Sequence, residues 1–94
     1  MNNRIELKFD NTLTNLAGYD YGVTIYNKQV KGQVDLEKPF EIVFPSQIKG
    51  VASSFVQGFF ENIVESIGLL QTEKNARIVS DKAGFSEMIM SKLQ

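Results

Sequence analysis

The segment from Phe40 to Gly68, FEIVFPSQIKGVASSFVQGFFENIVESIG, constrains the fold of this chain more than any other. Phe40–Phe44 is an almost continuous apolar run, and Pro45 ends it because proline cannot donate to a sheet ladder. A polar loop then leads to a serine pair and to a long run of apolar residues at helical spacing. The pattern predicts a central strand buried on both faces, a loop, and a long helix.

The predicted helix has a wide apolar face. Its apolar residues form two adjacent rows, Phe55, Phe59, Ile63 and Ile67 in one, and Val56, Phe60 and Val64 in the other. At about 100° per residue, these residues together with Val51 cover an arc of roughly 220°. An arc of this width predicts that the helix packs against both a sheet and a neighbouring helix.

The ends of this helix also carry recognisable signals. Ser54 and Gln57 fit the capping box, in which a serine and a glutamine three residues later satisfy two backbone donors of the first turn. Gly68 occupies the position where a left-handed C-terminal cap is expected.

Two further strands and a last helix are predicted on either side of this segment. Arg4–Phe9 alternates apolar and charged residues, which is typical of a half-buried strand, and Ala76–Ser80 is a second short β-rich run. Asp81 is a candidate cap for a final helix. The apolar positions of that helix are Phe85, Met88, Ile89 and Leu93.

Residues 19–30 fit two patterns. Tyr21, Val23 and Ile25 alternate like a strand, whereas the spacing of Tyr19, Val23, Tyr26 and Val30 is helical. Intrinsic propensity favours a strand over Tyr21–Tyr26. A connection between parallel strands needs a dozen or more residues and is usually a helix, so we expect a helix here.

The resulting order, β-α-β-α-β-α, predicts a single α/β domain over residues 1–94. Its expected architecture is a small sandwich, with a mainly parallel or mixed sheet of three or four strands and helices mostly on one face.

Composition excludes several kinds of site. The chain has no cysteine and no histidine, so it cannot form a Cys/His zinc site, a thiol nucleophile or a Ser-His-Asp triad. Its net charge is −1 and its lysines and arginines are scattered, which does not favour nucleic-acid binding. The first residues lack an apolar signal core, and no run is long enough to span a bilayer. We therefore expect a cytoplasmic protein without membrane contact, cofactor or catalytic activity.

The segment around the serine pair resembles STAS domains, the fold of anti-sigma-factor antagonists. In that family a strand and a short loop lead to an Asp-Ser-Ser-Gly motif at the start of a long helix. Here Ile42–Phe44 is similar to the strand, and Ala52-Ser53-Ser54-Phe55 falls on the motif without a gap. Ser-Ser-Phe before a phenylalanine-rich helix is also similar to short bacterial STAS-like domains of unknown function. Ala52 and Phe55 differ from the aspartate and glycine of the antagonists.

The resemblance implies a regulatory module whose partner is an ATPase of the histidine-kinase type. It also implies that Ser54 matches the serine phosphorylated in the antagonists, with Ser53 as its neighbour. The simpler interpretation of Ser54 is a helix cap. Two alternative functions are a domain that senses a nucleotide or another anion at the helix start, and a small inhibitor of the kind that phages encode.

The polar face of the long helix is the predicted protein-binding edge. Helical projection places five residues on it, Ser54, Gln57, Gly58, Glu61 and Glu65. Glycine leaves a notch one turn after Ser54, and the two glutamates are suited to basic residues of a partner. The alternative is a solvated face with a tolerated glycine. Nothing in the sequence desolvates either glutamate, so acid–base catalysis by this pair is not expected.

Overall fold

Three parallel strands form the main sheet of the computed structural model, which describes residues 3–93. They are β1 (Arg4–Glu6), β3 (Phe40–Val43) and β5 (Ala76–Val79), in the order β1-β3-β5. The prediction that Phe40 begins a central strand is confirmed. The first strand is shorter than the alternating segment Arg4–Phe9, although the Leu7 N–H still donates to the Val43 carbonyl oxygen at 2.9 Å.

Helices connect these strands. The first connection contains α1 (Tyr19–Ile25) and the π-helical turn η1 (Tyr26–Val30), which confirms the helical interpretation of residues 19–30. The second connection contains α2 (Ser53–Ile67) and α3 (Leu69–Asn75), and α4 (Phe85–Ser91) follows the last strand. A two-stranded parallel sheet of β2 (Asn15–Leu16) and β4 (Gly50–Val51) joins the loops before α1 and α2.

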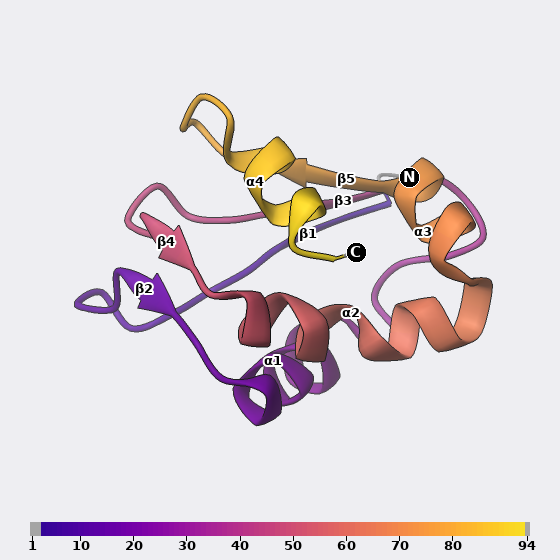
Figure 1. Ribbon diagram of the computed structural model, residues 1–94, viewed down its shortest axis with the longest axis horizontal. Coiled ribbons are helices and arrows are strands. Elements are labelled where there is room, and N and C mark those ends of the chain that lie inside the picture. The colour runs from indigo at the N-terminus through magenta and orange to yellow at the C-terminus, as the bar shows by residue number, and fades with distance from the viewer. Residues whose placement is uncertain (1–2, 94) are drawn as a thin grey trace.

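The strand order explains why one face of the sheet is covered. The strands follow one another in space as in sequence, so successive right-handed crossovers place their helices on the same side. Figure 1 shows α1 and α2 together on one side of the strands. The fold is therefore the expected α/β sandwich, with a parallel three-stranded sheet and an additional small sheet.

No helix among residues 3–93 covers the other face of the sheet, which corrects the prediction that the Phe40–Phe44 strand is buried on both faces. Glu41 and Val43, on the outer face, are only partly buried. Arg4 and Arg77 lie across from Glu41 on the two neighbouring strands, and Arg4 forms an ion pair with Glu41 at 2.6 Å. The apolar run of β3 is therefore explained by one buried face and a half-exposed valine.

The core lies between the inner face of the sheet and the helices. Phe40, Ile42 and Phe44 are buried there, and the two predicted apolar rows of α2 pack onto them. Phe59 is at the centre, since its ring centroid lies 5.2–6.4 Å from four other aromatic rings. These rings belong to Tyr26, Phe44, Phe55 and Phe60. The long helix thus contacts both the sheet and α1, as its wide apolar arc predicts.

Two features around α3 and α4 differ from the sequence prediction. The α4 N-cap is Gly84, in a left-handed conformation with φ of 78°, and Asp81 lies outside the helix, so its predicted capping role is wrong. Residues 69–75 form an unpredicted helix whose buried side chains include polar Thr72 and Asn75. The Thr72 hydroxyl donates to the Gly68 carbonyl oxygen, and the Asn75 amide donates to the Leu36 carbonyl oxygen. Apolar periodicity misses this helix because hydrogen-bonded polar groups fill its buried positions.

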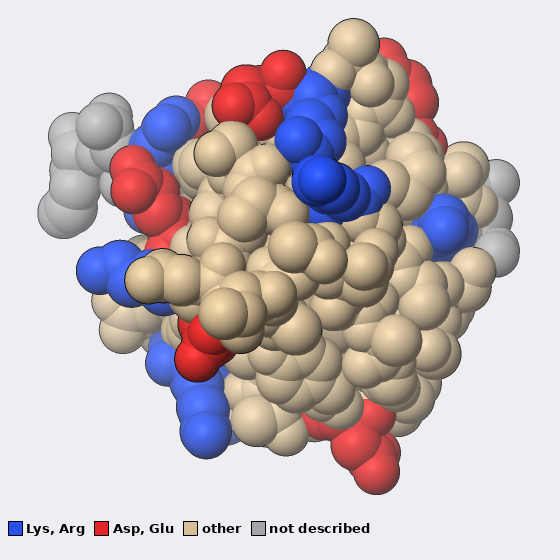
Figure 2. Space-filling view, turned by 90° about the vertical axis from the view of Figure 1, so that its left-hand side faces the viewer, with Lys and Arg blue, Asp and Glu red and all other residues tan. Residues whose placement is uncertain are grey.

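No helix among residues 3–93 is long and apolar enough to cross a membrane. The end of the molecule that contains β2 and β4 is shown in Figure 2. Much of this face is free of charged side chains, and its few lysine and arginine atoms lie along its upper part and edges. The uncharged sequence stretches 11–19 and 50–60 are joined at this end by the β2–β4 ladder.

Candidate functional site

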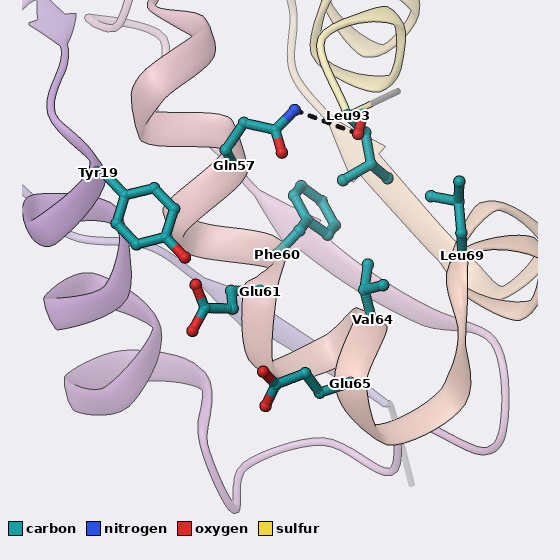
Figure 3. Close-up of a pocket in the computed structure, with 8 residues that line it drawn as sticks. All are labelled: Tyr19, Gln57, Phe60, Glu61, Val64, Glu65, Leu69 and Leu93. Carbon is teal, nitrogen blue, oxygen red and sulfur yellow. Dashed lines mark hydrogen bonds between the residues drawn. The ribbon is translucent and has the colours of Figure 1, made fainter.

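A groove of about 340 Å³ runs along the exposed side of α2. Residues from four helical regions of the chain surround it (Figure 3). They are Tyr19 of α1, Gln57, Phe60, Glu61, Val64 and Glu65 of α2, Leu69 of α3, and Leu93 after α4. The positions contributed by α2 recur every three or four residues, which is the spacing of one helix face.

The groove combines an apolar floor with an acidic rim. Phe60 and Leu93 are buried at its base, and Val64 is partly buried between them and the rim. Glu61 and Glu65 lie one helical turn apart along one edge (Figure 3). No cation pairs with either carboxylate within residues 3–93, so both are available to a partner.

Exposed apolar side chains gather at this groove. The large hydrophobic residues that are exposed in the described chain are Tyr19, Leu69 and Leu70, at 43%, 40% and 78% exposure. Tyr19 and Leu69 line the groove from opposite sides, and Leu70 follows Leu69 in the first turn of α3. Isolated exposed leucines are common in folded proteins, whereas exposed apolar side chains gathered at one groove are typical of interaction surfaces.

Gln57 closes one end of the groove. Its side-chain amide donates to the carbonyl oxygens of Lys92 and Leu93, at 2.7 and 3.2 Å (Figure 3 draws the bond to Leu93). The predicted capping box between Ser54 and Gln57 is therefore wrong. Its glutamine is used to hold the end of the chain against α2, a long-range contact that the local sequence cannot reveal.

Ser54 connects two helices rather than capping one. The α2 N-cap is Ala52, and no side-chain hydrogen bond caps this helix. The Ser54 hydroxyl oxygen accepts a hydrogen bond of 3.0 Å from the backbone N–H of Gly18, the residue before α1. Ser53 and Ser54 are both exposed, so their hydroxyl groups remain accessible at the start of α2.

Gly58 does not form the predicted notch. It is buried where α1 crosses α2, and a Cβ atom added there would collide with the carbonyl oxygen of Tyr19. Gly22 of α1 makes the reciprocal approach, since a Cβ atom on it would collide with the Phe55 carbonyl oxygen. The two glycines allow the helix backbones to touch, and helical projection of α2 alone could not show this partner.

The five residues of the predicted binding edge therefore do not all lie at one site. Gln57, Glu61 and Glu65 line the groove together, Ser54 lies at the start of the same helix, and Gly58 belongs to the helix crossing. The contributions of Tyr19, Leu69 and Leu93 to the groove were not predicted from the sequence. The one sequence feature that could have indicated this surface is the pair of adjacent leucines, 69 and 70, before a polar stretch.

A second, more polar depression of about 490 Å³ lies on the other flank of α2. It is lined by Tyr26, Lys31, Asn62, Glu65 and Ser66. Burial raises the pKa of the Tyr26 phenol, because removal from water disfavours the phenolate. Glu65 borders both depressions, whereas the apolar floor belongs to the first alone.

Within the described residues, no cluster of three or more acidic side chains could hold a metal ion. Comparisons of the chain with protein-family models, with curated proteins and with solved structures found no match. The resemblance to STAS domains therefore remains a prediction from the sequence around Ser53 and Ser54.

Proposed function

We propose that this protein is a non-catalytic regulatory module that binds another protein through the groove along α2. The observation that carries the proposal is the convergence of exposed Tyr19 and Leu69 with the rim glutamates Glu61 and Glu65 around one apolar floor. Protein interfaces typically combine an apolar centre with a charged or polar rim, and this surface has both.

The chemistry of the groove supports binding rather than catalysis. Its two carboxylates are at the rim, and Glu65 is exposed to solvent. A general acid or base needs an environment that tunes its pKa and a second group within reach of the substrate. The other side chains of the groove are apolar, a tyrosine, and a glutamine already bonded to the main chain.

The resemblance supplies the proposed partner and switch. An ATPase of the histidine-kinase type is the partner class that it implies, in the cytoplasm, with phosphorylation of Ser54 as the regulatory event. The exposed hydroxyl groups of Ser53 and Ser54 are compatible with access by a kinase. A phosphate at this position would lie at the N-terminus of a 15-residue helix, where the helix dipole stabilises negative charge.

Because the chain has no cysteine, a single photoreactive group can be attached at a chosen position. We would couple a benzophenone maleimide to Leu70→Cys, which is beside the groove, and to Glu6→Cys, on the outer face of the sheet. Irradiation in an extract of the native cell should give a discrete protein adduct from position 70 and none of that mass from position 6. Equal labelling from both positions would contradict binding at the groove.

The same preparation tests the ligand-sensing alternative. A protein-binding module should keep its melting temperature when ATP or ADP is added, because ligands that bind the native state raise it. A rise in melting temperature on addition of nucleotide, with no protein adduct at position 70, would favour a nucleotide-sensing domain instead.

A further inference from the structure

The groove also indicates what kind of segment fits it, an inference that rests on the proposed function. We infer that the occupant is an amphipathic helix of the partner, with an apolar stripe for the floor and two lysines or arginines one turn apart for Glu61 and Glu65. Three features of the groove lead to this class: its backbone, its borders and its charge.

None of the residues that line the groove lies in a strand, so an extended peptide would find no strand edge to pair with. The α2 backbone uses its hydrogen-bonding groups within the helix, and the other borders are α1, the start of α3 and the turn after α4. An extended segment would lose hydrogen bonds to water without replacing them, whereas a helix brings its own bonds already made. A helical occupant therefore avoids a desolvation cost that a strand would incur.

The borders of the groove are spaced to accept a helix of the partner. The lining residues of α2 run from Gln57 to Glu65, a rise of about 12 Å or slightly more than two helical turns. Tyr19 stands on one side of this length and Leu69 on the other, with Phe60 and Val64 between them (Figure 3). A helix lying between such walls would present apolar side chains at intervals of three and four residues.

The charge of the rim selects a basic segment. Glu61 and Glu65 are four residues apart on α2, so their carboxylates recur at the pitch of a helix laid alongside. Lys31 lies in the depression on the other flank of α2 and makes no ion pair with Glu65. The described residues that line the groove itself include no lysine or arginine, so a basic partner meets no like charge there.

A phage-displayed library of random peptides, each about 12 residues long, would test this inference on the intact protein. The length allows about three helical turns. We expect the enriched peptides to share an apolar stripe and two basic residues at a separation of three or four. The best of them should gain helical circular dichroism on binding, and it should bind Leu69→Glu at least about tenfold more weakly than the parent.

Two charge-reversed variants complete the test. Glu61→Lys/Glu65→Lys reverses the rim, and Glu6→Lys/Glu37→Lys makes the same charge change at exposed positions elsewhere. The rim variant should bind the selected peptide about tenfold or more weakly than the parent does. The control variant should bind it with an affinity within about twofold of the parent's. Both variants must keep the parent circular dichroism spectrum.

Several results would overturn the inference. They are enrichment of neutral, acidic or non-helical peptides, failure to enrich any peptide, and equal binding to the parent and the rim variant. These outcomes are separate from the cross-linking result at Leu70, which requires no assumption about charge or helicity. If a protein adduct formed at Leu70 but the library yielded neutral, extended peptides, the proposed function would stand and the inference of a basic helix would be wrong.

Discussion

Gly58 and Gly22 set the distance between α1 and α2. Both are buried in helices, where glycine ordinarily costs about 1 kcal/mol relative to alanine. Glycine is required at both positions because a Cβ atom would collide with the backbone of the neighbouring helix. Gly58 is therefore packed against α1, whereas Glu61 and Glu65, three and seven residues further along the same side of α2, line the groove.

The Gly58→Ala variant should lower the free energy of unfolding by about 1–3 kcal/mol, despite the better helix propensity of alanine. The added methyl group has to push α1 away from α2, since the obstructing atom belongs to the Tyr19 backbone. Chemical denaturation measures the change. Ser66→Ala, at an exposed position of the same helix, is the control and should stay within about 0.5 kcal/mol. A Gly58→Ala protein as stable as the parent would mean that the helices do not cross this closely.

The two serines at the start of α2 should respond differently to alanine. Ser54→Ala removes the acceptor for the Gly18 N–H and should cost about 0.5–1.5 kcal/mol. Ser53→Ala removes an exposed hydroxyl and should be close to neutral. Thermal unfolding of the pair provides the comparison, and coincident melting curves would show that the contact between Ser54 and α1 contributes nothing.

At the scale of elements, α2 was the most predictable part of the fold. Its apolar rows are strong enough to specify the helix, its buried face and its two neighbours. Predictions failed where one element depends on another. Gln57 bonds to the turn after α4, Gly58 meets α1, and Asn75 of α3 donates to the Leu36 carbonyl oxygen.

The groove shows the same division between local and long-range information. Helical projection found Gln57, Glu61 and Glu65 because they share one face of one helix. It could not supply Tyr19 and Leu69, which come from other elements and reach the groove only after folding. A single sequence contains the helix face, whereas the walls that turn this face into a groove depend on tertiary contacts.

Truncation of Phe59 tests the packing of α2 as an element. Phe59→Ala removes a ring that packs against η1, the residue after β3 and its own helix, and should cost about 3–5 kcal/mol. Phe59→Leu keeps most of the apolar volume and should cost clearly less. Denaturant titration of both variants separates these values; a midpoint for Phe59→Ala equal to that of the parent would contradict the central position of this ring.

At the scale of the whole molecule, the sandwich has two dissimilar surfaces. The outer face of the sheet carries charged residues such as Arg4, Glu41 and Arg77, of which Arg4 and Glu41 are already paired. The helical layer contains the groove, with unpaired carboxylates beside exposed apolar side chains. We therefore expect a partner to approach the helical layer and to leave the sheet face in water.

Alkaline titration reports on the integrity of this layer through Tyr26. Burial raises the pKa of its phenol above the ordinary value of 10.0, so the folded state retains a proton that the unfolded chain releases. The contribution of this group to stability is present below pH 10.0 and is lost as the pH rises through the folded-state pKa. Absorbance at about 295 nm should show a late tyrosine ionisation that Tyr26→Phe removes. A titration curve of unchanged shape in Tyr26→Phe would contradict burial of this phenol.

If a protein partner docks on the groove along α2, the yield of the adduct formed from benzophenone at Leu70→Cys should depend on the acidic rim of the groove. The yield would be measured at limiting protein concentration in three backgrounds: unchanged, Glu61→Lys/Glu65→Lys, and Glu6→Lys/Glu37→Lys. Reversal of the rim should lower the yield about tenfold, the equivalent of about 1.4 kcal/mol of binding free energy. The control reversal should leave it unchanged. Equal yields from all three folded proteins would contradict docking at this groove.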